Sequence, residues 1–268
     1  LVEGSDGVGG YLTDNTAESI ARSVGAESAI VVPIGATEQH GRHLPLSTDF
    51  VIADETARAV AEVLRDEPVW FLPTLPFSKS DEHAWSAGTI WLSVSTMLAI
   101  VDDIARSVSE TGAGRLVFLN GHGGNTTLLN VACRDIRRKY GLLTFLTHPL
   151  VPPAYSSASG VDTGELGMGI HGGLDETSIM LHLRPDLVDL DRAEPNVPTW
   201  LLNNEHVRFG GAVQFGWLSV DFGPSGVIGD PTGATAEYGK ELFANSVATV
   251  AAQLREILAF EFVAPDET

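Results

Sequence analysis

One segment of the chain concentrates the side chains that bind divalent metals in proteins. "GATEQHGRHLPLSTD", residues 35–49, contains Glu38, His40, His43 and Asp49, although the whole chain has only 8 histidines. Carboxylate and imidazole ligands together suit Zn, Mn or Fe. An E-x-H pair in a loop can direct both side chains into one cavity. The segment therefore indicates a metal site, but Asp49 could instead cap a helix, and the other side chains could belong to a polar surface loop.

The second polar stretch is "NGHGGN", residues 120–125. Its glycines permit positive φ angles and a close approach of the backbone to a ligand, and the N–H groups of a following helix could bind an anion. Gly123, Gly124 and Asn125 are therefore candidates for substrate contact. His122 is either a metal ligand or an incidental residue of a glycine-rich turn.

The third stretch is "GIHGGLDETSIMLHLRPD", residues 169–186. His171 precedes Glu176 by five residues, and Glu176 begins an apolar helical stretch. Asp175 and Glu176 both suit the first turn of a helix, where a carboxylate interacts favourably with the helix dipole. Glu176 is thus either a structural acid at a helix start or a further metal ligand.

The fourth stretch is "SKSDEHAWSAGT", residues 78–89. Glu82, His83 and Trp85 could line a pocket, with Glu82 and His83 near the reacting groups and Trp85 against the substrate. The alternative is an exposed polar loop, which is the usual place for such a sequence.

Taken together, three of the four stretches supply enough ligands for two metal ions that share a carboxylate. The candidate ligands are Glu38, His40, Asp49, His122 and Glu176. His171 is left over as a candidate for proton transfer, because imidazole can gain or lose a proton near neutral pH.

The elements that must position these residues alternate between strands and helices. Continuous apolar runs predict strands at 28–36, 69–77, 115–124 and 142–150, and helical spacing predicts helices at 48–66, 95–112, 125–141 and 235–259. This order implies an α/β fold with a mostly parallel central sheet and helices on both faces. Ligands collect beyond the carboxyl ends of such strands, and three of the polar stretches follow predicted strands. Residues 150–170 predict a long loop that could act as a lid.

Composition excludes several classes of function. The formal charge of −19, from 35 acidic and 16 basic residues, disfavours nucleic acid and anionic membranes as partners. No apolar run reaches the length of a membrane span, and no secretory signal is visible. The single cysteine, Cys133, excludes an internal disulfide and a cysteine-based zinc cluster. We therefore expect one cytoplasmic domain over residues 1–268.

The motifs "PIGATEQHGRHLPLSTD", "SDEHAWSAGT", "NGHGGN" and "HGGLDETS", in this order and spacing, resemble the creatininase (creatinine amidohydrolase) family, as does "GDPTGATAEYG" at 229–239. The resemblance covers about residues 28–240. It implies a three-layer α/β/α fold, hydrolysis of a cyclic or linear amide C–N bond, and a homo-oligomer, commonly a hexamer. It also implies two divalent ions (Zn, Mn or Fe) held by the five candidate ligands, with Asp49 bridging and His171 catalytic.

One motif departs from the family pattern. In creatininase itself the third motif reads NGHYEN and its glutamate is a metal ligand, whereas this chain has Gly124 at that position. Glu176 would then complete the second metal site, and creatinine becomes a doubtful substrate. The wider family includes deformylase-like enzymes and the peptide-trimming enzyme of mycofactocin biosynthesis. The substrate is accordingly expected to be a small molecule or a short peptide with an amide bond.

The ligand set predicts a hydrolytic mechanism. Two bound cations would lower the pKa of a bridging water, and the resulting hydroxide would attack an amide carbonyl. His171 would pass a proton to the leaving nitrogen. The competing hypothesis is a non-catalytic domain that binds a nucleotide or metabolite through "NGHGGN". That hypothesis leaves Glu38, His40 and Asp49 unexplained, and their carboxylates would repel a phosphate.

Overall fold

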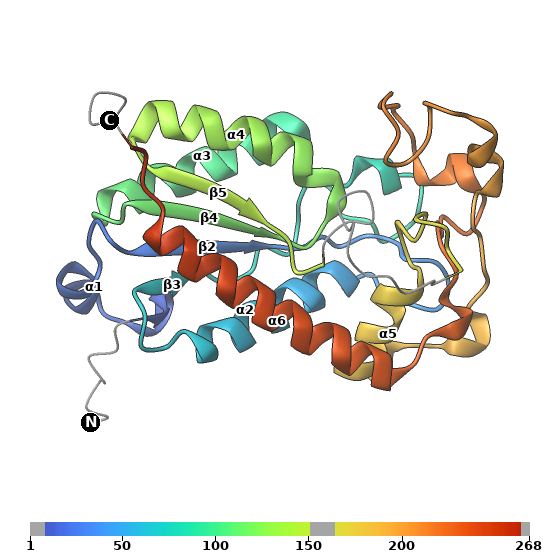
Figure 1. Cartoon of the computed structure of the whole chain (residues 1–268), viewed down its shortest axis with the longest axis horizontal. Helices are drawn as coiled ribbons and strands as arrows, with labels where there is room; N and C mark the ends of the chain where they lie inside the picture. Colours follow the sequence, from blue (N-terminus) through green and yellow to red (C-terminus); the bar gives the residue numbers. More distant parts are fainter. Residues whose placement is uncertain (1–8, 151–163, 264–268) are drawn as a thin grey trace.

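A five-stranded parallel sheet forms the centre of the molecule in this computed structural model, which describes residues 9–150 and 164–263. The strands are ordered β1-β3-β2-β4-β5, and every neighbouring pair runs parallel. Their bounds are β1 Gly10–Tyr11, β2 Ala29–Ile34, β3 Val69–Phe71, β4 Arg115–Asn120 and β5 Leu143–Thr147. The carboxyl ends of the strands therefore all lie toward the same end of the molecule, on the right in Figure 1.

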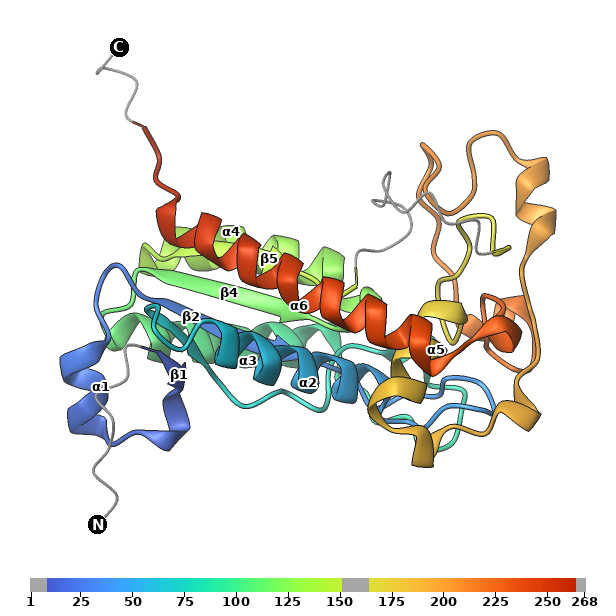
Figure 2. The same cartoon turned by 60° about the horizontal axis from the view of Figure 1, so that its bottom comes forward.

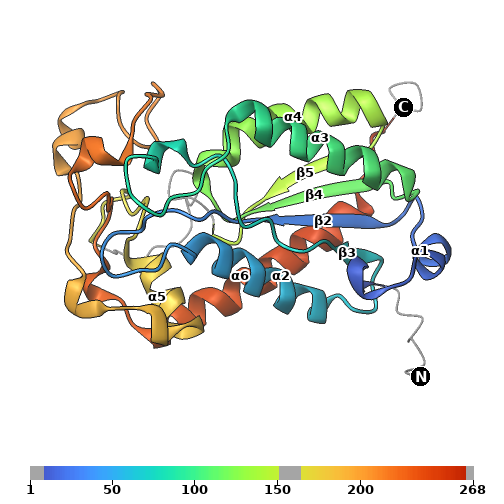
Figure 3. The same ribbon diagram turned by 180° about the vertical axis from the view of Figure 1, so that it is seen from behind.

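Two helical layers enclose this sheet. Helices α3 (Val94–Glu110) and α4 (Thr126–Tyr140) cover one face, whereas α2 (Thr48–Val63) and α6 (Ala236–Ala259) cover the other (Figures 2 and 3). Along β2, Ile30 packs toward the first pair of helices and Val31 toward the second. Successive side chains of a strand point to opposite faces, so a strand covered on both sides is a continuous apolar run. The predicted α/β/α architecture is confirmed.

The predicted helices and three of the four predicted strands match the observed elements to within a few residues. The strand predicted at 69–77 is too long, since β3 spans only Val69–Phe71 and the following Pro73 and Pro76 lack the N–H groups of a regular strand. The sequence pattern did not reveal β1 or the short helix α1 (Ala17–Ser23), because neither has a long periodic run. Residues 191–233 form loops and short 3₁₀ turns. Of the predicted 150–170 loop, residues 151–163 lie outside the described part of the chain. In the parts that the structure describes, no helix has the length and apolarity needed to cross a bilayer.

Helix α5 (Leu174–Leu183) lies beyond the carboxyl ends of the strands and packs against α6. The two helices approach closely at Gly239, where a Cβ atom would lie only 1.8 Å from the carbonyl oxygen of Ser178. Only glycine permits this contact without moving one helix. Since α5 carries Glu176 in its first turn, the α5–α6 contact fixes the position of that carboxylate relative to the sheet.

Candidate metal centre

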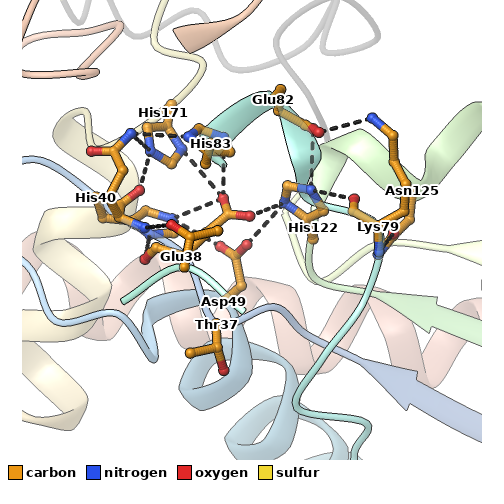
Figure 4. Close-up of polar contacts among 12 residues, drawn as sticks. Thr37, Glu38, His40, Asp49, Lys79, Glu82, His83, His122, Asn125 and His171 are labelled. Atoms are coloured by element: carbon orange, nitrogen blue, oxygen red, sulfur yellow. Dashed lines mark hydrogen bonds and ion pairs between the residues drawn. The ribbon is translucent and has the colours of Figure 1, made fainter. Parts of the chain in front are cut away.

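The loop between β2 and α2 delivers three of the predicted ligands into the protein interior. Glu38 and His40 lie in the loop, and Asp49 lies in the first turn of α2, where it is buried. Its two carboxylate oxygens bind different imidazoles, since Oδ1 is 3.0 Å from His40 Nε2 and Oδ2 is 3.0 Å from His122 Nδ1 (Figure 4). Asp49 therefore links two histidines and does not cap its own helix.

Glu38 is the most unusual side chain of this group. It is fully buried, and neither carboxylate oxygen accepts a hydrogen bond from any described residue. Nitrogens of four imidazoles surround it at 3.2–3.9 Å, from His40, His83, His122 and His171. A buried carboxylate without donors is costly to desolvate, and a coordinated cation would remove this cost. The arrangement fits a metal ligand.

The ligand atoms form groups of the size that one ion requires. Glu38, Asp49 and His122 present atoms within 4.8 Å of one another, and so do His40, Asp49 and Glu176. Asp49 belongs to both groups, which is the geometry expected for a carboxylate shared by two ions. A third group, Glu38, His40 and His171, overlaps with these two. Oxygen and imidazole nitrogen donors in this proportion suit Zn, Mn or Fe.

The charge balance of the group favours a cation. Burial alone would lower the pKa of His40, but Asp49 outweighs it and raises that pKa to about 10. Burial raises the pKa of Glu176 to about 7, although His40 opposes this effect. Burial would also raise the pKa of Asp49, but His40 and His122 hold it well below its usual range. A proton thus occupies His40 at neutral pH when no metal does, so metal binding should release protons and weaken as the pH falls.

His171 lies beside the ligands with one nitrogen engaged and the other available. Its ring stacks between His40 and His83, with both centroid distances 4.2 Å. Nε2 donates a proton to the backbone carbonyl of Gln39 at 2.6 Å, and Nδ1 faces Glu38 Oε1 at 3.7 Å. Burial, together with the neighbouring His40 and His83, lowers the pKa of His171 well below its usual value. The side chain is therefore neutral, with a free lone pair directed at the ligands.

Glu82 and His83 are buried although Asp81, Ala84 and Trp85 beside them are exposed, so the alternative of an exposed polar loop is wrong for these two residues. The Gln39 amide donates to His83 Nδ1 at 2.9 Å, which places the His83 proton on Nε2, 3.4 Å from Glu38 Oε1. Glu82 Oε1 lies 3.3 Å from the other nitrogen of His122. Both side chains therefore contact ligands directly.

The four candidates for substrate contact are placed differently from one another. Asn125 is fully buried, and its amide donates to Asn120 and accepts from the backbone of Lys79, so it fixes the loop. Gly124 packs tightly against Glu82, whereas Gly123 is open and lines a cavity. Trp85 is 41% exposed and donates its indole N–H to Ser219.

Sequence reasoning missed several residues that support the site. Gln39 orients His83, Lys79 pairs with Glu82 at 2.8 Å, and Ser219 binds both Trp85 and the carbonyl of Glu82. Gln39 and Lys79 lie beside predicted site residues in the chain, and that adjacency was their only signal. His43, in contrast, bonds Thr177 and belongs to none of the ligand groups.

The anion-binding alternative for "NGHGGN" does not suit this geometry. Carboxylates of Glu38, Asp49 and Glu82 lie within 3.3 Å of His122 in the middle of the motif. A phosphate placed there would be repelled by all three groups.

Comparison with known proteins agrees with the site. A family model described as "Creatininase: Creatinine amidohydrolase" matches residues 13–254. The chain belongs to the creatininase family. It is 35% identical over 226 residues to the mycofactocin precursor peptide peptidase of Mycobacterium ulcerans, covering 82% of this chain and 81% of that protein. It is 32% identical over 194 residues to the creatinine amidohydrolase of Pseudomonas putida, covering 66% of this chain and 73% of the other.

Solved creatininase structures share the fold. A mutant creatininase described as "Zn-Zn type" superimposes with a TM-score of 0.69 at 26% identity, covering 92% of this chain and 98% of that one. Creatininase-family proteins of this group are hydrolases, and this chain is a hydrolase of the same family. Its buried ligand groups are candidate metal sites.

Proposed function

We propose that the chain is a dinuclear metal-dependent amidohydrolase whose substrate is a peptide. The observation that carries the metal requirement is Glu38, a fully buried carboxylate with two unsatisfied oxygens inside a ring of imidazoles. The sharing of Asp49 between two ligand groups supports two ions. Cations at such sites supply a nucleophile from water near neutral pH and polarise the amide carbonyl.

The side chains around the ligands prepare the site for proton transfer. The hydrogen bond from His171 Nε2 to the Gln39 carbonyl fixes the tautomer, so that Nδ1 accepts a proton on the side of the ligands. An amide nitrogen must be protonated before it leaves, because its anion is a poor leaving group. We assign this transfer to His171, and we assign the orientation of Glu38 to His83.

The relatives favour a peptide as the substrate, and a cavity gives access to the candidate ligands. Four relatives are called mycofactocin precursor peptide peptidases, three from Mycobacterium and one from Mycolicibacterium smegmatis. Each is 32–36% identical to this chain over about four fifths of its length. In addition, a cavity of about 140 Å³ reaches the centre at Glu176 and passes Gly123. No described atom lies within 4 Å of the Cβ that Gly123 lacks, so the cavity is open there.

The number of bound ions tests the proposal. Protein purified without chelator should contain about two ions per chain, and Glu176→Gln should contain about one, because only the His40 group loses a ligand. Elemental mass spectrometry measures both. The metal-loaded wild type should cleave peptide amides, and stripping with chelator should abolish cleavage until metal is restored. A wild type that takes up no Zn, Mn or Fe would refute the proposal.

The opening at Gly123 gives a test of substrate size. Gly123→Tyr should reduce kcat/KM for a peptide at least about tenfold by filling the cavity, whereas metal content should not change. The matched control is Gly216→Tyr, since Gly216 is equally open but does not line the cavity. Equal peptide activity in Gly123→Tyr and wild type would show that peptides enter by another route.

The homo-oligomer and the cytoplasmic location stay predictions from the sequence.

A further inference from the structure

The imidazole of His122 faces two different environments. Nδ1 lies 3.0 Å from Asp49 and 3.2 Å from Glu38, on the side of the ligand groups. Nε2 points the other way and lies 3.1 Å from the backbone carbonyl of Lys79. A histidine that binds metal through Nδ1 must carry its proton on Nε2, and the partner of that proton fixes the ring.

Glu82 is the second partner of the outer nitrogen. Its Oε1 lies 3.3 Å from His122 Nε2, and its Oε2 accepts from the Lys79 ammonium at 2.8 Å. The carboxylate is thus held between a lysine and the imidazole (Figure 4), and the Glu82 residue is 7% exposed. Lys79 thus contacts both groups, since its ammonium pairs with the Glu82 carboxylate and its backbone carbonyl accepts from His122 Nε2. The backbone N–H of Lys79 donates in turn to the side chain of Asn125.

Gly124 provides the space for this carboxylate. A Cβ atom at Gly124 would lie 1.8 Å from Glu82 Oε1 and 2.4 Å from His122 Nε2. Any side chain there would separate Glu82 from His122. The requirement for glycine at this point does not come from a positive φ angle, since only the contact excludes a larger residue.

We propose that Glu82 is a positioning residue that acts through His122, and that Gly124 admits it to the ring. The ion pair with Lys79 fixes the position of the Glu82 carboxylate. That carboxylate accepts the Nε2 proton of His122 in a hydrogen bond, so the lone pair on Nδ1 is free to bind metal. A negative charge at the outer nitrogen also makes Nδ1 a stronger ligand. This proposal rests on the proposed metal-dependent function. The residue that orients the ligand His122 is then Glu82, which lies in the segment after the strand β3, whereas His122 follows β4.

Metal affinity of the full chain tests it. In competition with a chromophoric chelator, Glu82→Ala should bind Zn²⁺ about 10–100-fold more weakly than wild type, and Glu82→Gln should lie between them. The Co²⁺-loaded Glu82→Ala protein should also show a shifted visible absorption band, because the orientation of His122 changes. Asp81→Asn is the matched control, because Asp81 pairs with the same lysine at 3.0 Å from an exposed position. It should match wild type in both measurements.

The role of Gly124 is tested by adding a Cβ atom at that position. Gly124→Ala should weaken Zn²⁺ binding at least as much as Glu82→Ala does, because the added Cβ would displace Glu82 and would also lie 2.4 Å from His122 Nε2. Wild-type affinity in Glu82→Ala, or an equal loss in Asp81→Asn, would overturn the role of Glu82. Wild-type affinity in Gly124→Ala would overturn the role of Gly124. A wild type that binds no metal would instead overturn the proposed function, and this proposal with it.

Discussion

Asp49→Asn should release both metal ions and reduce hydrolysis by about 10³-fold or more. The five predicted ligands form two groups, one with Glu38 and His122 and one with His40 and Glu176, and Asp49 belongs to both. Its loss therefore removes a ligand from each ion. Bound metal contributes several kcal/mol to such reactions, and each 1.4 kcal/mol corresponds to a factor of ten in rate. Asparagine has nearly the same shape and still accepts a hydrogen bond from His40, so the packing around the side chain is conserved.

Ion counting and kinetics together identify the role of Asp49. Elemental mass spectrometry should find about two ions in wild type, about one in Glu176→Gln and close to none in Asp49→Asn. Asp54→Asn makes the same chemical change on the same helix, and its side chain bonds Arg58 and Thr74 outside the centre. It should keep the metal content and most of the activity. Two retained ions in Asp49→Asn would show that Asp49 is not shared.

The sequence predicted the central sheet well because burial on both faces leaves a simple pattern. Strands β2 and β4 are buried at every position, so their apolar runs could be recognised without knowledge of the tertiary structure. The rule that ligands lie beyond the carboxyl ends of parallel strands then brought Asp49 and His122 together, although 73 residues separate them. Strand β1 has only two residues, and no local pattern can identify so short an element.

The support around the ligands could not be predicted in the same way. Lys79 and Glu82 resemble any polar loop in sequence, and only the fold shows that the carboxylate is buried against His122. Ser219 lies 137 residues from Glu82, and its contact with the Glu82 carbonyl depends on how the later loops fold back. Asn125 of "NGHGGN" was predicted to contact the substrate, yet its amide and that of Asn120 hold the loop together. Periodicity and strand ends predict where ligands gather, whereas hydrogen bonds between loops depend on the packed structure.

His171→Gln should reduce kcat by about 10²–10⁴-fold while leaving the metal content and KM close to those of wild type. A glutamine amide reaches as far as Nε2 and can still donate to the Gln39 carbonyl, which accepts from His171 in the native protein. It has no basic atom in place of Nδ1, however, so it cannot carry a proton to the leaving nitrogen. The predicted loss is therefore chemical and not structural.

The same variant distinguishes a proton carrier from a ligand, because His171 also belongs to the group with Glu38 and His40. If His171 bound metal, His171→Gln would lose an ion, and adding metal would restore part of the activity. If it transfers protons, the ion count stays at about two, and a substrate with a more acidic leaving group should recover much of the rate. His43→Gln is the matched control, since the buried His43 bonds only the Thr177 hydroxyl among the described side chains and lies outside the ligand groups. Loss of metal in His171→Gln, with His43→Gln unchanged, would reassign His171 from proton transfer to metal binding.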